Sequence, residues 1–194
     1  MPDSVAADTT AFTDFIRAMT ILVEREREPD ALVVETMTLM LPLLRSDRWL
    51  PEPFATPSPE SYRQYLLHCD PLERFSVVSF VWNPGQRTPI HDHMTWGAVG
   101  VLKGREVSTN YRRGACGMEV TGVDSLDVGQ IIGINAGAVD IHQVDNGIDG
   151  VTISIHVYGG NIGRIVRHRY DPASGEQMPF TSGYSAAVLP NFWG

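Results

Sequence analysis

Hydrophobic residues recur at helical spacing near the start of the chain. Six of them follow one another at intervals of one or three residues: Phe12, Phe15, Ile16, Met19, Leu22 and Val23. This spacing predicts an amphipathic helix. Pro29 begins a second apolar run that extends to Leu44 and predicts a second helix with a kink at Pro42, because proline suits a helix start and disrupts a helix interior. A third helix is expected from Ser58 through Leu67.

From residue 75 onward the pattern changes to short segments rich in β-forming residues. These segments span 75–82, 98–102, 107–111, 131–134 and 151–158, and Gly, Asn, Asp and Pro divide them. Strands of this length with no helix between them imply antiparallel pairing, and closing the sheet removes its open edges. We therefore expect one mainly β domain over 1–194. Its helical N-terminal section (1–70) would pack on an antiparallel barrel or sandwich (71–194).

Composition narrows the possible partners. The 194 residues include 15 Lys and Arg against 23 Asp and Glu, a net charge of -8, which argues against nucleic acid and anionic membranes as partners. No apolar stretch reaches the ~20 residues of a membrane span, and the acidic N-terminus does not resemble a signal peptide. Two isolated cysteines suggest a reducing compartment. We expect a cytoplasmic protein that binds a small molecule, and its oligomeric state stays open.

Five of the six histidines lie in or just after the β half of the chain. Alternate residues of a strand point to the same face, so His91 and His93 can reach one ion while Asp92 points away. A third histidine, His142, follows the segment 131–134. A lone histidine is more often structural than a ligand, and a His-x-His pair alone is a weak signal. The glycines around these histidines strengthen the signal for a metal site.

Two glycine-framed segments resemble the two signature motifs of the cupin superfamily. The first contains Gly85, His91, His93 and Gly104, and the second contains Gly129, Gly137, His142 and Asn146. The resemblance implies a cupin jelly-roll barrel with a metal ion held by His91, His93 and His142. The first motif normally supplies a glutamate ligand as well, but Gly97 occupies its place.

A site of three neutral imidazoles leaves the ion its full double charge and open positions for an anionic, bidentate ligand. A thiolate with a second donor atom would compensate the charge and fill the open positions. Iron would supply the redox step that O2 requires. Zinc also accepts three histidines, but it would imply hydrolase or lyase chemistry.

Ser154, His156 and Tyr158 alternate along one predicted strand and so share a face. They could form the exposed face of an edge strand, or a hydrogen-bonded relay from serine through imidazole to phenol. A hydrolase triad is disfavoured, because neighbours on one strand cannot form a nucleophile elbow.

Together these features resemble bacterial thiol dioxygenases of the cysteine dioxygenase type I family, over roughly Tyr62 to Tyr184. The motifs that carry the resemblance are Pro89-Ile90-His91-Asp92-His93 with Trp96-Gly97, then Ile141-His142-Gln143-Val144-Asp145-Asn146, and finally Ser154, His156 and Tyr158 before Gly159-Gly160-Asn161. The resemblance implies Fe(II) as the cofactor, a small thiol and O2 as substrates, a sulfinic acid as product, and catalytic roles for Ser154, His156 and Tyr158. Animal members carry a cysteine that bonds to the tyrosine, whereas Gly97 and Ala98 occupy that neighbourhood here, so no crosslink is expected.

Two residues bear on the substrate. Cysteine-specific members have a carboxylate-binding arginine where Gln64 lies in this chain, which favours relatives similar to 3-mercaptopropionate dioxygenase. In those relatives a later arginine binds the carboxylate, and Arg167 matches its place; guanidinium is the natural bidentate partner of a carboxylate. Arg63 is adjacent, so the sequence leaves open whether Arg63 or Gln64 faces the site.

Two other functions stay open at this stage. One is a different mononuclear metal-dependent cupin enzyme, such as a dioxygenase of another small acid or an isomerase. The other is a non-catalytic cupin that binds a small ligand, which would need neither metal nor relay.

Overall fold

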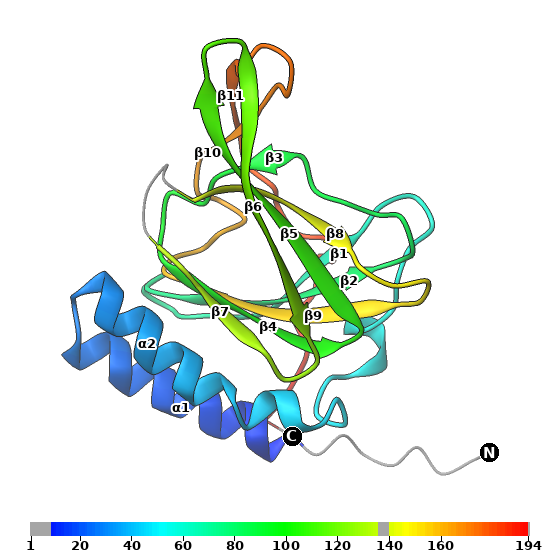
Figure 1. Cartoon of the computed structure of the whole chain (residues 1–194). Helices are drawn as coiled ribbons and strands as arrows, with labels where there is room; N and C mark the ends of the chain where they lie inside the picture. The colour runs from blue at the N-terminus through cyan, green and yellow to red at the C-terminus, as the bar shows by residue number, and fades with distance from the viewer. Residues whose placement is uncertain (1–8, 136–139, 194) are drawn as a thin grey trace.

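Two antiparallel β-sheets face each other in the computed structural model and enclose a barrel interior (Figure 1). The structure describes residues 9–135 and 140–193, so the acidic N-terminal residues and Gly137 lie outside it. The first sheet contains, in spatial order, β1 (Arg63–Cys69), β2 (Ser76–Trp82), β9 (Thr152–Tyr158), β4 (Gly97–Lys103) and β7 (Ile131–Ile134). The second contains β11 (Gln177–Phe180), β10 (Arg167–Tyr170), β3 (Ile90–His91), β8 (Ile141–Asn146), β5 (Arg105–Gly114) and β6 (Gly117–Asp127).

The strand order is that of a jelly roll. Without the edge strands β1, β10 and β11, two four-stranded sheets remain, β2-β9-β4-β7 and β3-β8-β5-β6. The chain passes from one sheet to the other between successive strands of this set, except at the β5–β6 hairpin. This is the double-sheet architecture of cupins. The predicted mainly β, cupin-type fold is therefore confirmed.

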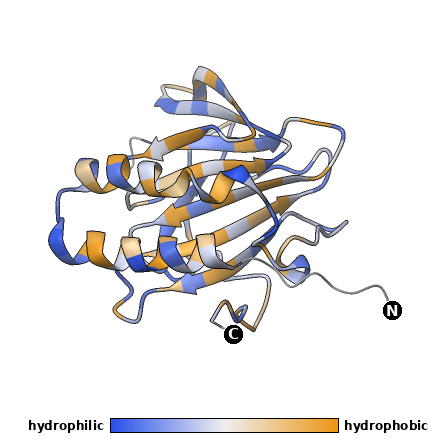
Figure 2. Cartoon of the chain, turned by 90° about the horizontal axis from the view of Figure 1, so that it is seen from below, coloured by the Kyte–Doolittle hydropathy of each residue, from blue (hydrophilic) through white to orange (hydrophobic). Residues whose placement is uncertain are grey.

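Two antiparallel helices cover the outer face of the first sheet, α1 (Thr10–Arg25) and α2 (Pro29–Met40) (Figures 1 and 2). The larger hydrophobic core lies between these helices and the sheet, and a smaller one lies inside the barrel. Gly133 on β7 permits the close approach of α2, because a Cβ there would lie 2.4 Å from Val33 Cγ1. The expected packing of N-terminal helices on the barrel is confirmed.

The second helix ends earlier than its apolar pattern predicts. It stops at Met40, and a 3-10 turn η1 (Leu43–Arg45) follows Pro42, so the predicted kinked helix up to Leu44 is wrong. Proline has no backbone N–H with which to continue the helical hydrogen bonds, and the chain turns instead. A second 3-10 turn, η2 (Glu52–Phe54), lies within the proline-rich connection that leads to β1.

The predicted third helix is also wrong, because its segment forms strand β1. This strand pairs with β2 and contains a register shift between Leu66 and His68. Leu67 joins the core under the helices and Leu66 packs against the core inside the barrel, because adjacent residues of a strand point to opposite faces. Both faces of this strand carry apolar side chains, so the segment lacks the apolar and polar alternation that would have identified a strand.

Several other strands lack a hydrophobic signature. Strand β6 is mostly exposed, and β10 and β11 are short, so none of them shows the expected apolar alternation. Their pairing with neighbouring strands determines their conformation. Within the described residues, no helix combines the length and apolar character needed to cross a lipid bilayer.

Candidate metal centre

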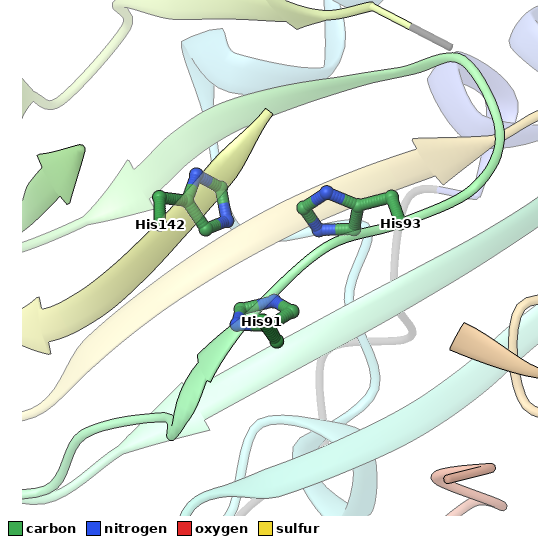
Figure 3. Close-up of side chains that lie close together, drawn as sticks. All are labelled: His91, His93 and His142. Atoms are coloured by element: carbon green, nitrogen blue, oxygen red, sulfur yellow. The ribbon is translucent and has the colours of Figure 1, made fainter. Parts of the chain in front are cut away.

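Three buried histidines converge inside the barrel (Figure 3). His91 on β3 and His142 on β8 are register partners on adjacent strands, and His93 follows two residues after the end of β3. One ring nitrogen from each residue lies within 4.8 Å of the others. The predicted convergence of the three rings is therefore present, with two on paired strands and the third in the segment between β3 and β4.

Hydrogen bonds orient two of these rings. His91 Nδ1 lies 3.0 Å from the carbonyl oxygen of Pro89, which can only accept, so Nδ1 carries the hydrogen and Nε2 keeps a free lone pair. His142 Nδ1 lies 3.4 Å from Ser108 Oγ. Burial lowers the pKa of His91, His93 and His142 below the ordinary value, so all three rings are neutral near pH 7.

Asp140 lies beside two of the rings. Its carboxylate oxygens are 3.7 Å from Nδ1 of His93 and 3.7 Å from Nδ1 of His142. His93 Nδ1 is buried without a hydrogen-bond partner, and burial raises the pKa of Asp140. Neutral imidazole nitrogens with a carboxylate close by are common surroundings of a bound metal ion. The donor set therefore fits a transition metal ion.

Asp92 points away from the cluster, as the alternation predicts. Its fully buried carboxylate accepts hydrogen bonds from the backbone N–H and Nδ1 of His168 and from the hydroxyl of Tyr170. These bonds attach the segment between His91 and His93 to β10. Asp92 thus holds the spacing of two of the convergent rings, and His168 has a structural role.

Gly97 leaves no room for the glutamate that cupin motifs carry. A Cβ at this position would lie 2.8 Å from the carbonyl oxygen of Val157 and 3.1 Å from Cδ1 of Tyr158. Gly97 and Tyr158 are register partners on β4 and β9. The phenol ring therefore occupies the space beside Gly97, and the three-histidine donor set has no carboxylate from β4.

Ser154, His156 and Tyr158 form a continuous hydrogen-bonded series. Ser154 Oγ lies 2.8 Å from His156 Nε2, and His156 Nδ1 lies 2.8 Å from the Tyr158 hydroxyl. Strand β9 is central in its sheet and all its residues are buried, which excludes the exposed-edge alternative. The Tyr158 ring stacks on His93 with centroids 5.4 Å apart, and burial raises its pKa. The series therefore ends against the histidine cluster.

A cavity of about 260 Å³ connects the histidines to two further predicted residues. Gln64 and Arg167 both line it, and both donate to Ser182 Oγ, at 2.8 Å and 2.6 Å. Arg63 turns the other way and bonds to Ser58. The sequence left Arg63 and Gln64 as alternatives, and the structure places Gln64 in the cavity.

Arg167 is a buried cation whose charge is not fully compensated. Its side chain is 4% exposed, its guanidinium lies 4.8 Å above the ring of Phe180, and its Nε has no hydrogen-bond partner. In the described part of the chain, no carboxylate forms an ion pair with it. Burial lowers its pKa, since desolvation penalises the charged form. An anion in the cavity would offset that penalty.

Besides Asp140, three residues near the site were not predicted from the sequence. Ser108 contacts His142, Ser182 joins Gln64 to Arg167, and Glu106 bonds to Ser154. Glu106, Ser108 and Asn110 alternate along β5, and all three line the cavity. That alternation of polar residues in the sequence could have identified these three as cavity residues. Ser182 lies outside the barrel motifs, and no sequence pattern marked it.

Comparisons with known proteins give distant structural similarities. No protein family model matches the chain. A protein of Klebsiella pneumoniae with a double-stranded β-helix domain is 16% identical, with a TM-score of 0.47 over 66% of this chain and 91% of that one. A cupin 2 domain-containing protein of Halorhodospira halophila is 19% identical, with a TM-score of 0.45 over 60% and 74%. A Thermus thermophilus protein is 21% identical, with a TM-score of 0.44 over 56% and 92%.

Proposed function

We propose that this protein is a non-haem Fe(II) thiol dioxygenase that converts a small thiol carboxylate, 3-mercaptopropionate or L-cysteine, to its sulfinic acid. The observation that supports this proposal best is a single cavity lined by three neutral histidines and by the buried guanidinium of Arg167. The histidines suit a metal cation that binds a thiolate, and the guanidinium of Arg167 suits a carboxylate. The cavity volume of about 260 Å³ lies just below the range of drug-sized sites and suits a small acid.

The ion would be held by His91, His93 and His142. When bound, ferrous iron supplies the electron-transfer chemistry that lets O2 react with a thiolate. The three imidazoles bring no negative charge, so a thiolate substrate would provide the charge compensation that the protein ligands lack. The overall change is balanced without another reductant, because the sulfur loses the four electrons that O2 gains and receives both oxygen atoms.

Arg167 would orient the substrate through its carboxylate. A guanidinium can donate two parallel hydrogen bonds to a carboxylate, and Arg167 already has an unpaired Nε. Ser182 and Phe180 hold the guanidinium in place. Gln64 shares Ser182 with Arg167 and lines the same wall, so it would border the substrate.

Tyr158 would contact the reacting groups. It lines the cavity beside His93, and His156 and Ser154 behind it fix the orientation of its hydroxyl. A phenol held this way can form a hydrogen bond with a group in the cavity at a defined position. Its burial also limits the access of water to that position.

Oxygen uptake by Fe(II)-loaded protein tests the proposal. Protein loaded without air is mixed with 3-mercaptopropionate, L-cysteine or cysteamine, and the product is identified by mass spectrometry with isotopically labelled O2. We expect one O2 consumed per thiol, both labelled atoms in the sulfinate, and the fastest turnover with 3-mercaptopropionate. Zn(II)-loaded protein is the control, because zinc has no redox step. No thiol-dependent uptake would reject the proposal and leave another metal-dependent cupin activity or simple ligand binding.

A further inference from the structure

A buried carboxylate extends the Ser154-His156-Tyr158 series across the barrel. Glu106 on β5 is 3% exposed and is hydrogen-bonded to Ser154 Oγ on β9, which belongs to the opposite sheet. Its Oε1 also lies 3.7 Å from His156 Nε2. Glu106 lines the same cavity as the histidine cluster. The series therefore has four members, and its far end is an acid.

Counting donors and acceptors gives this series a direction. An ionised carboxylate can only accept, so the single hydrogen of the Ser154 hydroxyl goes to Glu106. The two Ser154 lone pairs then accept from His156 Nε2, at 2.8 Å, and from the indole N–H of Trp82, at 3.4 Å. Every bonding position of Ser154 is then filled, which leaves it no hydrogen to donate to His156.

The direction continues to the phenol. A neutral imidazole that donates through Nε2 must accept through Nδ1, so Nδ1 of His156 accepts the Tyr158 hydrogen at 2.8 Å. The Tyr158 oxygen then offers only lone pairs to the cavity. With the opposite direction, Ser154 would donate to His156, His156 would donate to Tyr158, and the phenol hydrogen would point to the ligand.

We propose that Glu106 is a positioning residue that sets the hydrogen-bond direction of the relay, so that Tyr158 faces the cavity as an acceptor. This inference deepens the proposed function, and the catalytic meaning of the inference rests on that proposed function. The carboxylate of the substrate is then bound by Arg167, while the group that meets Tyr158 must carry its own hydrogen, as an ammonium or a water does. Charge-assisted hydrogen bonds are about twice as strong as neutral ones, so the carboxylate holds the direction firmly.

Imidazole nitrogen NMR of histidine-labelled, full-length protein measures this direction without turnover. The spectrum distinguishes a protonated ring nitrogen from an unprotonated one, and a His156→Gln variant identifies the signals of His156. In metal-free and in Zn(II)-loaded wild-type protein we expect the tautomer with hydrogen on Nε2. In Glu106→Gln we expect the ratio of the two tautomers to shift by roughly tenfold towards hydrogen on Nδ1.

Two further variants make the result decisive. Because the introduced amide oxygen of Glu106→Gln can still accept, Glu106→Leu is measured beside it and should shift the ratio at least as far. Glu106→Asp keeps the carboxylate and should restore the wild-type tautomer. Glu119→Gln on β6 is the matched control, since Glu119 forms an exposed ion pair with Arg112, and it should change nothing.

The outcomes separate this inference from the proposed function. Hydrogen on Nδ1 in the wild type, or an unchanged ratio in both Glu106→Gln and Glu106→Leu, would overturn the assigned role of Glu106 even if the protein oxidises thiols. The expected tautomer shift without any oxygen uptake would support the role of Glu106 and reject the dioxygenase proposal.

Discussion

His91 and His142 face each other as register partners on β3 and β8, so the strand pairing of the barrel itself brings two of the three candidate ligands together. The third, His93, lies two residues further along, in a segment that Asp92 attaches to β10 through His168 and Tyr170. A site held in this way is formed by the fold and does not depend on the metal for its shape.

The first prediction concerns metal content. His142→Ala should lower the bound Fe(II) or Zn(II), measured by elemental analysis after dialysis, by at least about tenfold, since loss of even an outer partner of a metal ligand costs that much. Cooperative thermal unfolding should persist, because β8 keeps its pairing. His68→Gln, which changes a histidine outside the cluster, should bind metal like the wild type. Equal metal content in both variants would rule out the site.

The second prediction concerns substrate affinity. Arg167→Met should raise the KM for thiol carboxylates by roughly 10- to 100-fold, the loss expected for hydrogen bonds to a charged group. The KM for cysteamine should change little, because cysteamine has no carboxylate. Arg169→Met, at an exposed position on the same strand, is the control. An equal rise for cysteamine would show that Arg167 acts only by packing.

The third prediction concerns the space beside Tyr158. Gly97→Ala should lower the free energy of unfolding by about 1–3 kcal/mol in urea denaturation, because the new methyl group would press on Val157 and on the phenol ring. Gly122→Ala is a suitable control, since its nearest neighbour would be 3.8 Å away. If both variants were equally stable, Gly97 would not be needed for this packing.

The fourth prediction concerns how stability depends on pH, through Asp70, a residue outside the candidate site. Hydrogen bonds from the Arg74 side chain, and then from backbone N–H groups, hold the pKa of the buried Asp70 below its ordinary value, although burial opposes them. The ionised carboxylate of Asp70 therefore stabilises the fold fully above its unfolded pKa of about 3.9. This stabilisation is lost as the pH falls through the lower pKa that Asp70 has in the folded state.

Asp70→Asn tests this linkage. It should reduce the free energy of unfolding by about 2 kcal/mol at pH 7, and the difference from wild type should disappear at the acid end of the titration. Asp47→Asn, at an exposed position, should match the wild type at every pH. A difference for Asp70→Asn that stays constant down to the lowest pH would show that charge is not the cause.

The pair of His91 and His93 and the relay could be predicted because both depend on short-range strand geometry, whereas the resemblance to the second cupin motif is what added His142. His91 and His93 are two positions apart, as are successive members of the series Ser154, His156 and Tyr158, and alternate residues of an extended chain share a face. The helices α1 and α2 were also visible in the apolar spacing. Apart from His142, each of these features follows from residues close together in the sequence.

Features that depend on distant contacts could not be predicted in the same way. Strand β1 is defined by its pairing with β2, which the local sequence pattern does not show, so a helix was expected there instead. The choice between Arg63 and Gln64 depends on which face of β1 meets the cavity, and a shift of one residue would reverse it. Ser182 meets Gln64 from 118 residues away, with no local pattern to mark it.

The hydrogen bonds from Gln64 and Arg167 to Ser182 form a part of the cavity wall that is separate from the histidine cluster and the relay. All three lie in β1, β10 and the segment after β11, outside the eight strands that carry the histidines and the relay. A related barrel could therefore keep its reactive centre and acquire a different ligand preference by exchanging these flanking pieces alone.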